Sequence, residues 1–200
     1  IKLALKAGVA TVREMKKENH LFMDQLLPEF QSPLDCSEEI GKALGISTSD
    51  IYSTVGPVQI VSTGLPVLVV PIASLKVLEK ISVDTLRLSR LLTSLGTDLL
   101  YVFTCQTYDP DATIHARAFA PKLGIPEDPA TGSAAGAVGA YLSMNKFISK
   151  ETCRNIFIEQ GHMMGRPSSL FVCIEKHKDK IKSVRVGGES VTLIKGEIST

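Results

Sequence analysis

The segment from Gly124 to Leu142 holds the residue types best suited to chemistry, in the order GIPEDPATGSAAGAVGAYL. Asp128, Thr131 and Ser133 come directly before a run of Ala, Gly and Val at helical spacing. The first N–H groups of a helix have no acceptor within the helix, and the helix dipole favours an anion at that end. Gly132 would let such an anion approach the backbone closely. A carboxylate and a hydroxyl beside an anion-binding helix end indicate a candidate active site.

The same residues also have a purely structural interpretation. Asp128 and Thr131 are ordinary N-cap residue types, and Pro129 suits the first turn of a helix. Many helices that do no chemistry begin in this way. The local pattern alone therefore leaves the catalytic and the capping interpretations both open.

A longer pattern around this segment resembles a known family. The strings RAFAP (117–121) and GIPEDPATGSA (124–134) resemble the signature of the PhzF-like family, the phenazine-biosynthesis isomerase and its relatives. Three further strings resemble strands of that family in the same order: STGLPVLVVP (62–71), EQGHMMGRPS (159–168) and VGGESV (186–191). The resemblance extends from about residue 6 onward, and EDPATGSA is its most specific part.

The resemblance implies an α+β fold of the diaminopimelate-epimerase type, in which an antiparallel sheet wraps around a central helix. The family has two such domains, with the active site in the cleft between them. By position, residues 1–52 and 193–200 would be a remnant of the first domain. Residues 53–192 would be the second domain, with its central helix at 133–144. The many strand-like segments and the absence of a βαβ pattern agree with an α+β fold.

Carried over by position, the resemblance implies catalytic roles for Asp128 and Ser133. It implies substrate binding by Thr131, Gly132, Ser133 and His162. The related racemases have a cysteine at the position of Ser133, and a serine hydroxyl is a far poorer base than a thiol. The remaining chemistry is proton shuttling by a carboxyl group, which predicts a cofactor-independent isomerase of a small carboxylic acid. We expect neither a cofactor nor a metal, because the histidines and cysteines are too scattered for a metal site.

The family's acid/base Glu and its Gly-His-Ala-Thr type of segment do not occur in these 200 residues. We expect that Glu in an N-terminal segment that precedes this sequence. The alternative is a non-catalytic or truncated scaffold of the same fold that binds a small acid or dimerises. The sequence leaves open the substrate, the identity of the general base, the choice between fragment and natural truncation, and a homodimer.

Composition excludes several classes of partner. The formal net charge of +1 gives no indication of a nucleic-acid or membrane partner, and no apolar run reaches the roughly 18 residues of a membrane span. Cys105 and Cys173 lie in apolar runs and are predicted to be buried, which favours a reducing compartment and a cytoplasmic protein. The basic run at 176–182, KHKDKIK, is predicted to be a solvated hairpin loop.

Periodicity and turn residues predict the remaining elements. Helices are expected at 37–44, 76–80 and 84–95, with a connection at 25–34. Strands are expected at 2–12, 20–24, 50–62, 66–72, 99–106, 113–119, 155–161, 168–175, 181–187 and 190–198. His115, Arg117 and Phe119 alternate onto one face of their strand, where His115 is expected to be a structural residue. Arg166 would either orient an acidic substrate or pair with Glu159 or Glu127.

Overall fold

The computed structural model describes residues 1–5, 8–15, 20–51 and 56–196. Four α-helices lie in this part of the chain: α1 (Ser37–Leu44), α2 (Leu75–Lys80), α3 (Thr85–Ser94) and α4 (Gly132–Met144). The strands are β1 (Lys2–Leu5), β2 (Gly8–Met15), β3 (His20–Asp24), β4 (Glu29–Phe30), β5 (Gln59–Ser62), β6 (Pro66–Pro71), β7 (Leu99–Thr104), β8 (Ile114–Ala120), β9 (Ile125–Asp128), β10 (Ile156–Gln160), β11 (Ser168–His177) and β12 (Lys180–Glu189). The predicted helices are confirmed to within one residue at nearly every end.

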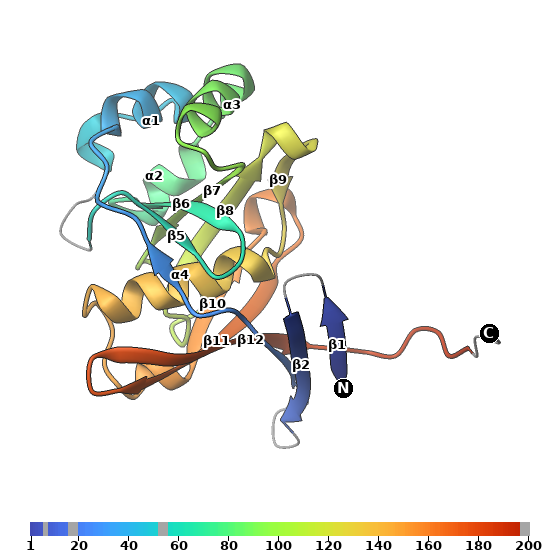
Figure 1. Ribbon diagram of the computed structural model, residues 1–200. Helices are drawn as coiled ribbons and strands as arrows, with labels where there is room; N and C mark the ends of the chain where they lie inside the picture. The colour runs from blue at the N-terminus through green and yellow to red at the C-terminus, as the bar shows by residue number, and fades with distance from the viewer. Residues whose placement is uncertain (6–7, 16–19, 52–55, 197–200) are drawn as a thin grey trace.

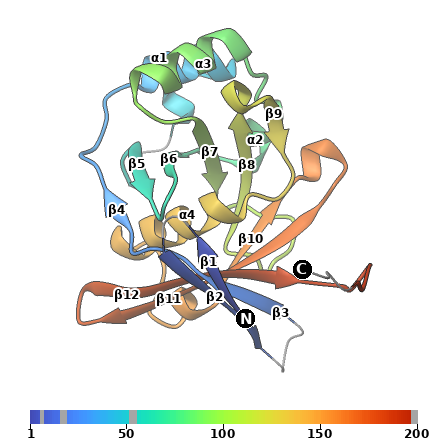
Figure 2. The same ribbon diagram turned by 45° about the vertical axis from the view of Figure 1, so that its right-hand side comes forward.

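These strands form one sheet in the order β1-β2-β3-β12-β11-β10-β8-β7-β6-β5-β4, with β9 paired to β8. Neighbouring strands are antiparallel except for two parallel pairs, β6 with β7 and β10 with β8. The sheet curls so that strands from both halves contact α4, namely β5, β6 and β7 on one side and β11 and β12 on the other. Figures 1 and 2 show α4 enclosed in this way. The predicted α+β fold, a sheet wrapped around a central helix, is confirmed.

Helix α4 can be enclosed because its residues are small. Every residue from Ala134 to Ser143 is buried, so the helix has no polar face. The tightest approach is at Gly139, where a Cβ atom would lie 2.6 Å from Cγ1 of Val172 on β11. A side chain at this position would therefore push the helix away from the sheet.

The outer face of β6 and β7 supports a second core. Alternate residues point to opposite faces of a strand. Val67, Val69 and Tyr101 accordingly pack toward α4, whereas Leu68 and Leu100 pack against helices α1, α2 and α3. Figure 2 shows α1 and α3 lying together at the top of the molecule, with β6 and β7 between them and β12.

Several predicted strand boundaries are wrong. Residues 2–12 are two antiparallel strands, β1 and β2, rather than one. In the predicted strand 50–62 only β5 is a strand among the described residues, and 52–55 lie outside them. No strand follows β12 within 190–196, and 197–198 lie outside the described residues. Strand β9 is not among the predicted strands.

Two other expectations concern the burial of the cysteines and the division of the chain into domains. Cys105 is exposed rather than buried, because β7 ends at Thr104, whereas Cys173 is half-buried. The division into residues 1–52 with 193–200 and residues 53–192 stays a prediction. In the structure α1 contributes Ile40 and Leu44 to the same core as β5 and β6, and β3 pairs with β12.

Candidate functional site at the N-terminus of helix α4

Helix α4 begins without a side-chain cap. Thr131 occupies the N-cap position but makes no capping hydrogen bond. Its hydroxyl instead donates to Oδ2 of Asp128 at 2.7 Å. The side chain of Thr131 thus binds the last residue of the preceding strand, β9. The first N–H groups of the helix, those of Gly132 and Ser133, have no side-chain acceptor among the described residues. The capping interpretation of Asp128 and Thr131 is therefore wrong.

These N–H groups belong to residues that line a pocket of about 370 Å³. Its walls come from α4, the end of β3, β11 and β12, and comprise Met23, Gln25, Ala130, Gly132, Ser133, Ser169, Leu170, Val186, Gly187 and Gly188. Ser133 is exposed to this space, while Thr131 lies buried behind it. Asp128 is half-buried next to Thr131 and does not itself line the pocket.

A close contact between β12 and β3 shapes one wall of this pocket. A Cβ atom at Gly187 would lie 2.5 Å from the backbone oxygen of Leu21. Glycine at this position therefore allows β12 to pair closely with β3, and the two strands together bring Val186 and Met23 to the pocket.

Gln160 on β10 organises the segment that leads into α4. Its Nε2 donates to the backbone oxygen of Asp128 at 2.6 Å and to Oγ1 of Thr131 at 2.9 Å. Its Oε1 accepts from the hydroxyl of Tyr101 at 3.0 Å and from the N–H of Thr131 at 3.3 Å. Gln160 is fully buried, so these four hydrogen bonds replace the bonds that its amide would make to water in the unfolded chain. Burial and the nearby charge of Asp128 raise the pKa of Tyr101, which keeps the phenol a hydrogen-bond donor.

Sequence analysis missed the role of Gln160, although a signal was present. Ile156, Ile158 and Gln160 alternate onto the same face of β10, and the two isoleucines belong to the core around α4. A polar residue in an apolar face must find hydrogen-bond partners when it is buried. That pattern marks Gln160 as the organiser of a buried polar network.

Strand β9 is held by an ion pair between the buried Arg117 and the half-buried Glu127. Nε and Nη2 of Arg117 on β8 donate to the two carboxylate oxygens of Glu127 at 2.9 and 2.8 Å. Nη1 of Arg117 donates to the backbone oxygens of Leu78 and Ile81. This pairing fixes Glu127 and thereby the position of Asp128. It also leaves Glu127 engaged with Arg117, so the predicted pairing of Arg166 with Glu127 is wrong.

His162 lies outside the pocket at Ser133. It lines a neighbouring pocket of about 490 Å³ together with Tyr108 and Glu159, and the two pockets share Ser169. The His162 ring lies 4.8 Å from the ring of His115, measured between ring centres. The structure thus brings Asp128, Thr131, Gly132 and Ser133 together and places His162 in the adjoining pocket.

His115 is a buried structural residue, as expected. Its Nδ1 lies 2.8 Å from Oε2 of Glu159, which also accepts from the N–H groups of Tyr108 and Asp109. Burial lowers the pKa of His115, and the neighbouring Glu159 carboxylate offsets only part of this effect. Because Glu159 pairs with His115, the predicted pairing of Arg166 with Glu159 is also wrong.

Other kinds of site find no support in the described part of the chain. None of its His, Cys, Asp and Glu side chains form a group of three or more that could hold a metal ion. None of its helices combines the length and the apolar character that crossing a membrane requires.

The fold, a sheet wrapped around a central helix, places the chain in the class of diaminopimelate-epimerase-like proteins. The chain belongs to the PhzF-like family: the sequence profile described as phenazine biosynthesis-like protein matches residues 1–196. An uncharacterized isomerase of Clostridium acetobutylicum is 34% identical over 197 residues, which cover 96% of this chain and 65% of that protein. The trans-2,3-dihydro-3-hydroxyanthranilate isomerase of Pseudomonas chlororaphis is 31% identical, covering 98% of this chain and 67% of that protein.

Solved structures agree with this assignment. A predicted epimerase from Pseudomonas aeruginosa is 31% identical, with a TM-score of 0.76, and covers 100% of this chain and 66% of that chain. A PhzF-family protein of Bacillus anthracis has a TM-score of 0.81 at 24% identity, covers 94% of this chain and 64% of that chain, and supports the fold alone. The chain spans just under two thirds of the length of several of these proteins.

Proposed function

We propose that this chain forms part of a cofactor-independent isomerase that acts on a small carboxylic acid. The observation that carries the proposal is the uncapped N-terminus of α4, where Gly132 and Ser133 line a pocket. Helix N-termini with free N–H groups are binding sites for carboxylate and phosphate groups. Several relatives bear the name isomerase, which supports the reaction class.

Each predicted site residue then has a distinct role. The N–H groups of Gly132 and Ser133 bind the substrate carboxylate, and the hydroxyl of Ser133 donates to it. Oδ2 of Asp128 accepts from Thr131, and Asp128 does not line the pocket, so its carboxylate contacts the substrate only where the substrate extends beyond the pocket toward β9. Thr131 positions Asp128. His162 contacts the substrate only where the substrate extends past Ser169 into the adjoining pocket.

The proposed reaction is a proton shuttle. A carboxyl group removes a carbon-bound proton and returns it to another carbon of the same molecule, so no redox change occurs. We propose that this carboxyl belongs to a Glu outside the 200 residues, while Asp128 and Ser133 orient the substrate and stabilise developing charge. A cytoplasmic location and a homodimer stay predictions.

One observation favours the alternative of a binding protein. The residues that line the pocket at Ser133 include no carboxylate, histidine, lysine or cysteine in the described part of the chain. A pocket without a titratable group can bind an acid but cannot move its proton. On this alternative, the chain binds a small carboxylate and leaves it unchanged.

The anion site can be tested by removing a single backbone donor. Gly132 is the first residue of α4, where proline is tolerated because that N–H has no acceptor within the helix. Gly132→Pro should weaken the binding of small carboxylates about tenfold or more, measured by calorimetry. Ser133→Ala, which keeps every N–H, should weaken it less. Equal affinity of Gly132→Pro and the unchanged protein would refute the anion site.

A further inference from the structure

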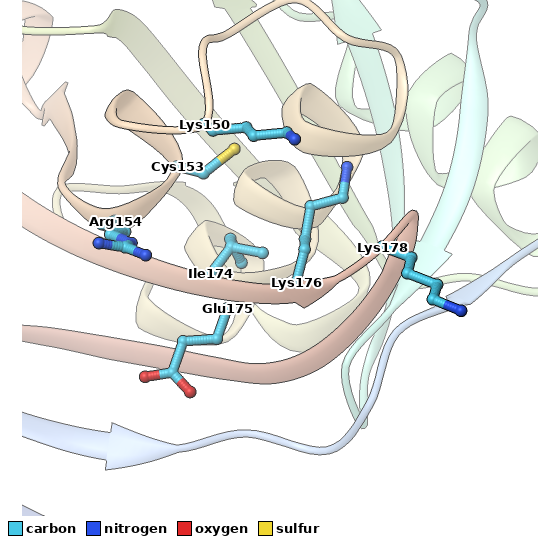
Figure 3. A pocket seen from close by; sticks show the side chains of 7 residues that line it. All are labelled: Lys150, Cys153, Arg154, Ile174, Glu175, Lys176 and Lys178. Atoms are coloured by element: carbon cyan, nitrogen blue, oxygen red, sulfur yellow. The ribbon is translucent and has the colours of Figure 1, made fainter.

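A third pocket lies at the opposite end of α4 from Ser133. It has a volume of about 350 Å³ and is lined by Lys150, Cys153, Arg154, Ile174, Glu175, Lys176 and Lys178. Figure 3 shows these side chains, which come from the connection between α4 and β10 and from the β11–β12 hairpin. Four of the seven are cations and one is an acid.

The single acid is engaged elsewhere. The carboxylate of Glu175 forms an ion pair with Arg185 on β12, which does not line the pocket. In Figure 3 the carboxylate of Glu175 points away from the ends of Lys150 and Lys176. Within the described residues, Lys150, Arg154, Lys176 and Lys178 form no ion pair with any carboxylate. The lining side chains therefore give the pocket a net positive charge, which the exposed Glu151 partly offsets for Lys150 and Arg154.

Lys176 is held in place rather than freely mobile. Its Nζ donates to the backbone oxygen of Ser143 at 3.0 Å, at the last turn of α4. Ser143 is buried and its hydroxyl accepts from the thiol of Cys153 at 3.4 Å. The ammonium group thus uses one of its three N–H donors on the helix end and keeps two for a ligand. A fixed cation loses less conformational freedom on binding than a mobile surface lysine.

We infer that this pocket binds a small dianion of the phosphate class, held by Lys150, Arg154 and Lys176. Cations gathered around a hollow favour a compact anion that can contact several of them at once. An extended polyanion fits less well, because Glu151 and Asp179 adjoin Lys150 and Lys178 in the sequence and interrupt the positive surface. The simpler account is that Lys176 only stabilises the negative end of the α4 dipole and the other cations are solvated.

The two accounts differ in an equilibrium binding measurement. Inorganic phosphate and pyrophosphate are titrated into the protein by calorimetry at constant ionic strength, since added salt screens exposed charges. Arg154→Gln and Lys176→Met should each raise the Kd about tenfold or more, because each removes a charged donor. Lys180→Gln is the matched control, because Lys180 lies on the same hairpin but does not line the pocket, and it should leave the Kd unchanged.

Four results would overturn the inference. Absence of saturable binding would leave Lys176 with its helix-end role alone. If Lys180→Gln weakens phosphate binding as much as the pocket variants do, the hairpin attracts anions in general and the pocket has no special role. Tighter binding of a short oligonucleotide that is also weakened by Lys180→Gln would show the same. Loss of phosphate binding in Gly132→Pro would place the ion at the other end of α4. Should Lys176→Met fail to fold, Arg154→Gln still decides between the accounts, because Arg154 is exposed and its side chain forms no hydrogen bond or ion pair with a described residue.

Discussion

The side-chain amide of Gln160 donates to the backbone oxygen of Asp128 at 2.6 Å and joins residues that are 32 positions apart. Through the same amide, Gln160 also binds the N–H and the hydroxyl of Thr131. Because Thr131 in turn donates to the carboxylate of Asp128, the orientation of that carboxylate depends on Gln160. Gln160 is thus a positioning residue for the candidate site, although it does not line the pocket.

Replacing Gln160 by leucine should therefore destabilise the fold and disturb the site together. The change leaves the hydroxyl of Tyr101 and the N–H of Thr131 buried without partners, at about 1–3 kcal/mol for each such group. We expect the free energy of unfolding in urea to fall by about 2–6 kcal/mol.

Gln106→Leu provides the matched control for this measurement. The side chain of Gln106 accepts one hydrogen bond, from the N–H of Leu75, at an exposed position. Its loss should change the free energy of unfolding by less than about 1 kcal/mol. Similar losses in the two variants would show that the buried amide of Gln160 has no special role.

The glycines of α4 should respond differently to an added methyl group. A Cβ at Gly139 would lie 2.6 Å from Val172, whereas one at Gly136 would lie 3.1 Å from Oγ1 of Thr63. Overpacking costs about 1–3 kcal/mol, while alanine gains up to about 1 kcal/mol over glycine in a helix. Gly139→Ala should therefore lower the melting temperature and Gly136→Ala should change it little. Gly136→Leu, which adds a larger side chain to the same enclosed helix, should lower it. Equal melting temperatures for the two alanine variants would contradict the packing of α4 against β11.

The His115–Glu159 pair predicts a loss of stability in acid. Burial lowers the pKa of His115 below its ordinary value of 6.5, so the unfolded chain takes up this proton at a higher pH than the folded one. For Glu159 burial acts to raise the pKa, but hydrogen bonds from His115, Asp109 and Tyr108 outweigh it and hold the pKa below 4.5. Both groups therefore stabilise the fold most at neutral pH and lose that contribution as the pH falls.

Denaturant unfolding at several pH values checks this prediction. Stability should fall as the pH drops through about 6.5, by at most about 1.4 kcal/mol per pH unit for one proton. His115→Gln should flatten the dependence between about pH 7 and about pH 5.5, leaving the fall near the pKa of Glu159. A free energy of unfolding that is constant or rises over this interval would refute the neutral, buried state of His115.

The sequence predicted the parts of the site that are local in the chain. The EDPATGSA string and the small residues after it were enough to predict where α4 begins. They also predicted that Asp128, Thr131, Gly132 and Ser133 lie together at that end of the helix. It was not enough to show that Thr131 turns away from the helix, because both the capping and the Asp128-bound rotamers suit that residue type. The contribution of Gln160 depends on the pairing of β10 with β8, which only the tertiary structure shows.

Strand boundaries failed for physical reasons. Gly124 and Pro126 are residue types typical of turns, yet Ile125–Asp128 pairs with β8 at an edge, where a proline needs no partner for its missing N–H. Val191, Leu193 and Ile194 have the apolar pattern of a strand but pair with no strand among the described residues and are largely exposed. A strand pattern predicts a strand only when a partner is present to complete the ladder.

Solvent deuterium exchange tests the central proposal most directly. The full-length protein, including the segment proposed to carry the Glu, is supplied with candidate acids in deuterated water. These acids include the trans-2,3-dihydro-3-hydroxyanthranilate named for a relative, and product carbon positions are followed by NMR. Proton shuttling predicts deuterium at product carbon, with rates lowered roughly 10²-fold or more in Asp128→Ala and Ser133→Ala while both variants stay folded. A variant Asp128→Ala that is folded and turns over at the unchanged rate, or binding of the acids with no exchange at all, would contradict the proposal.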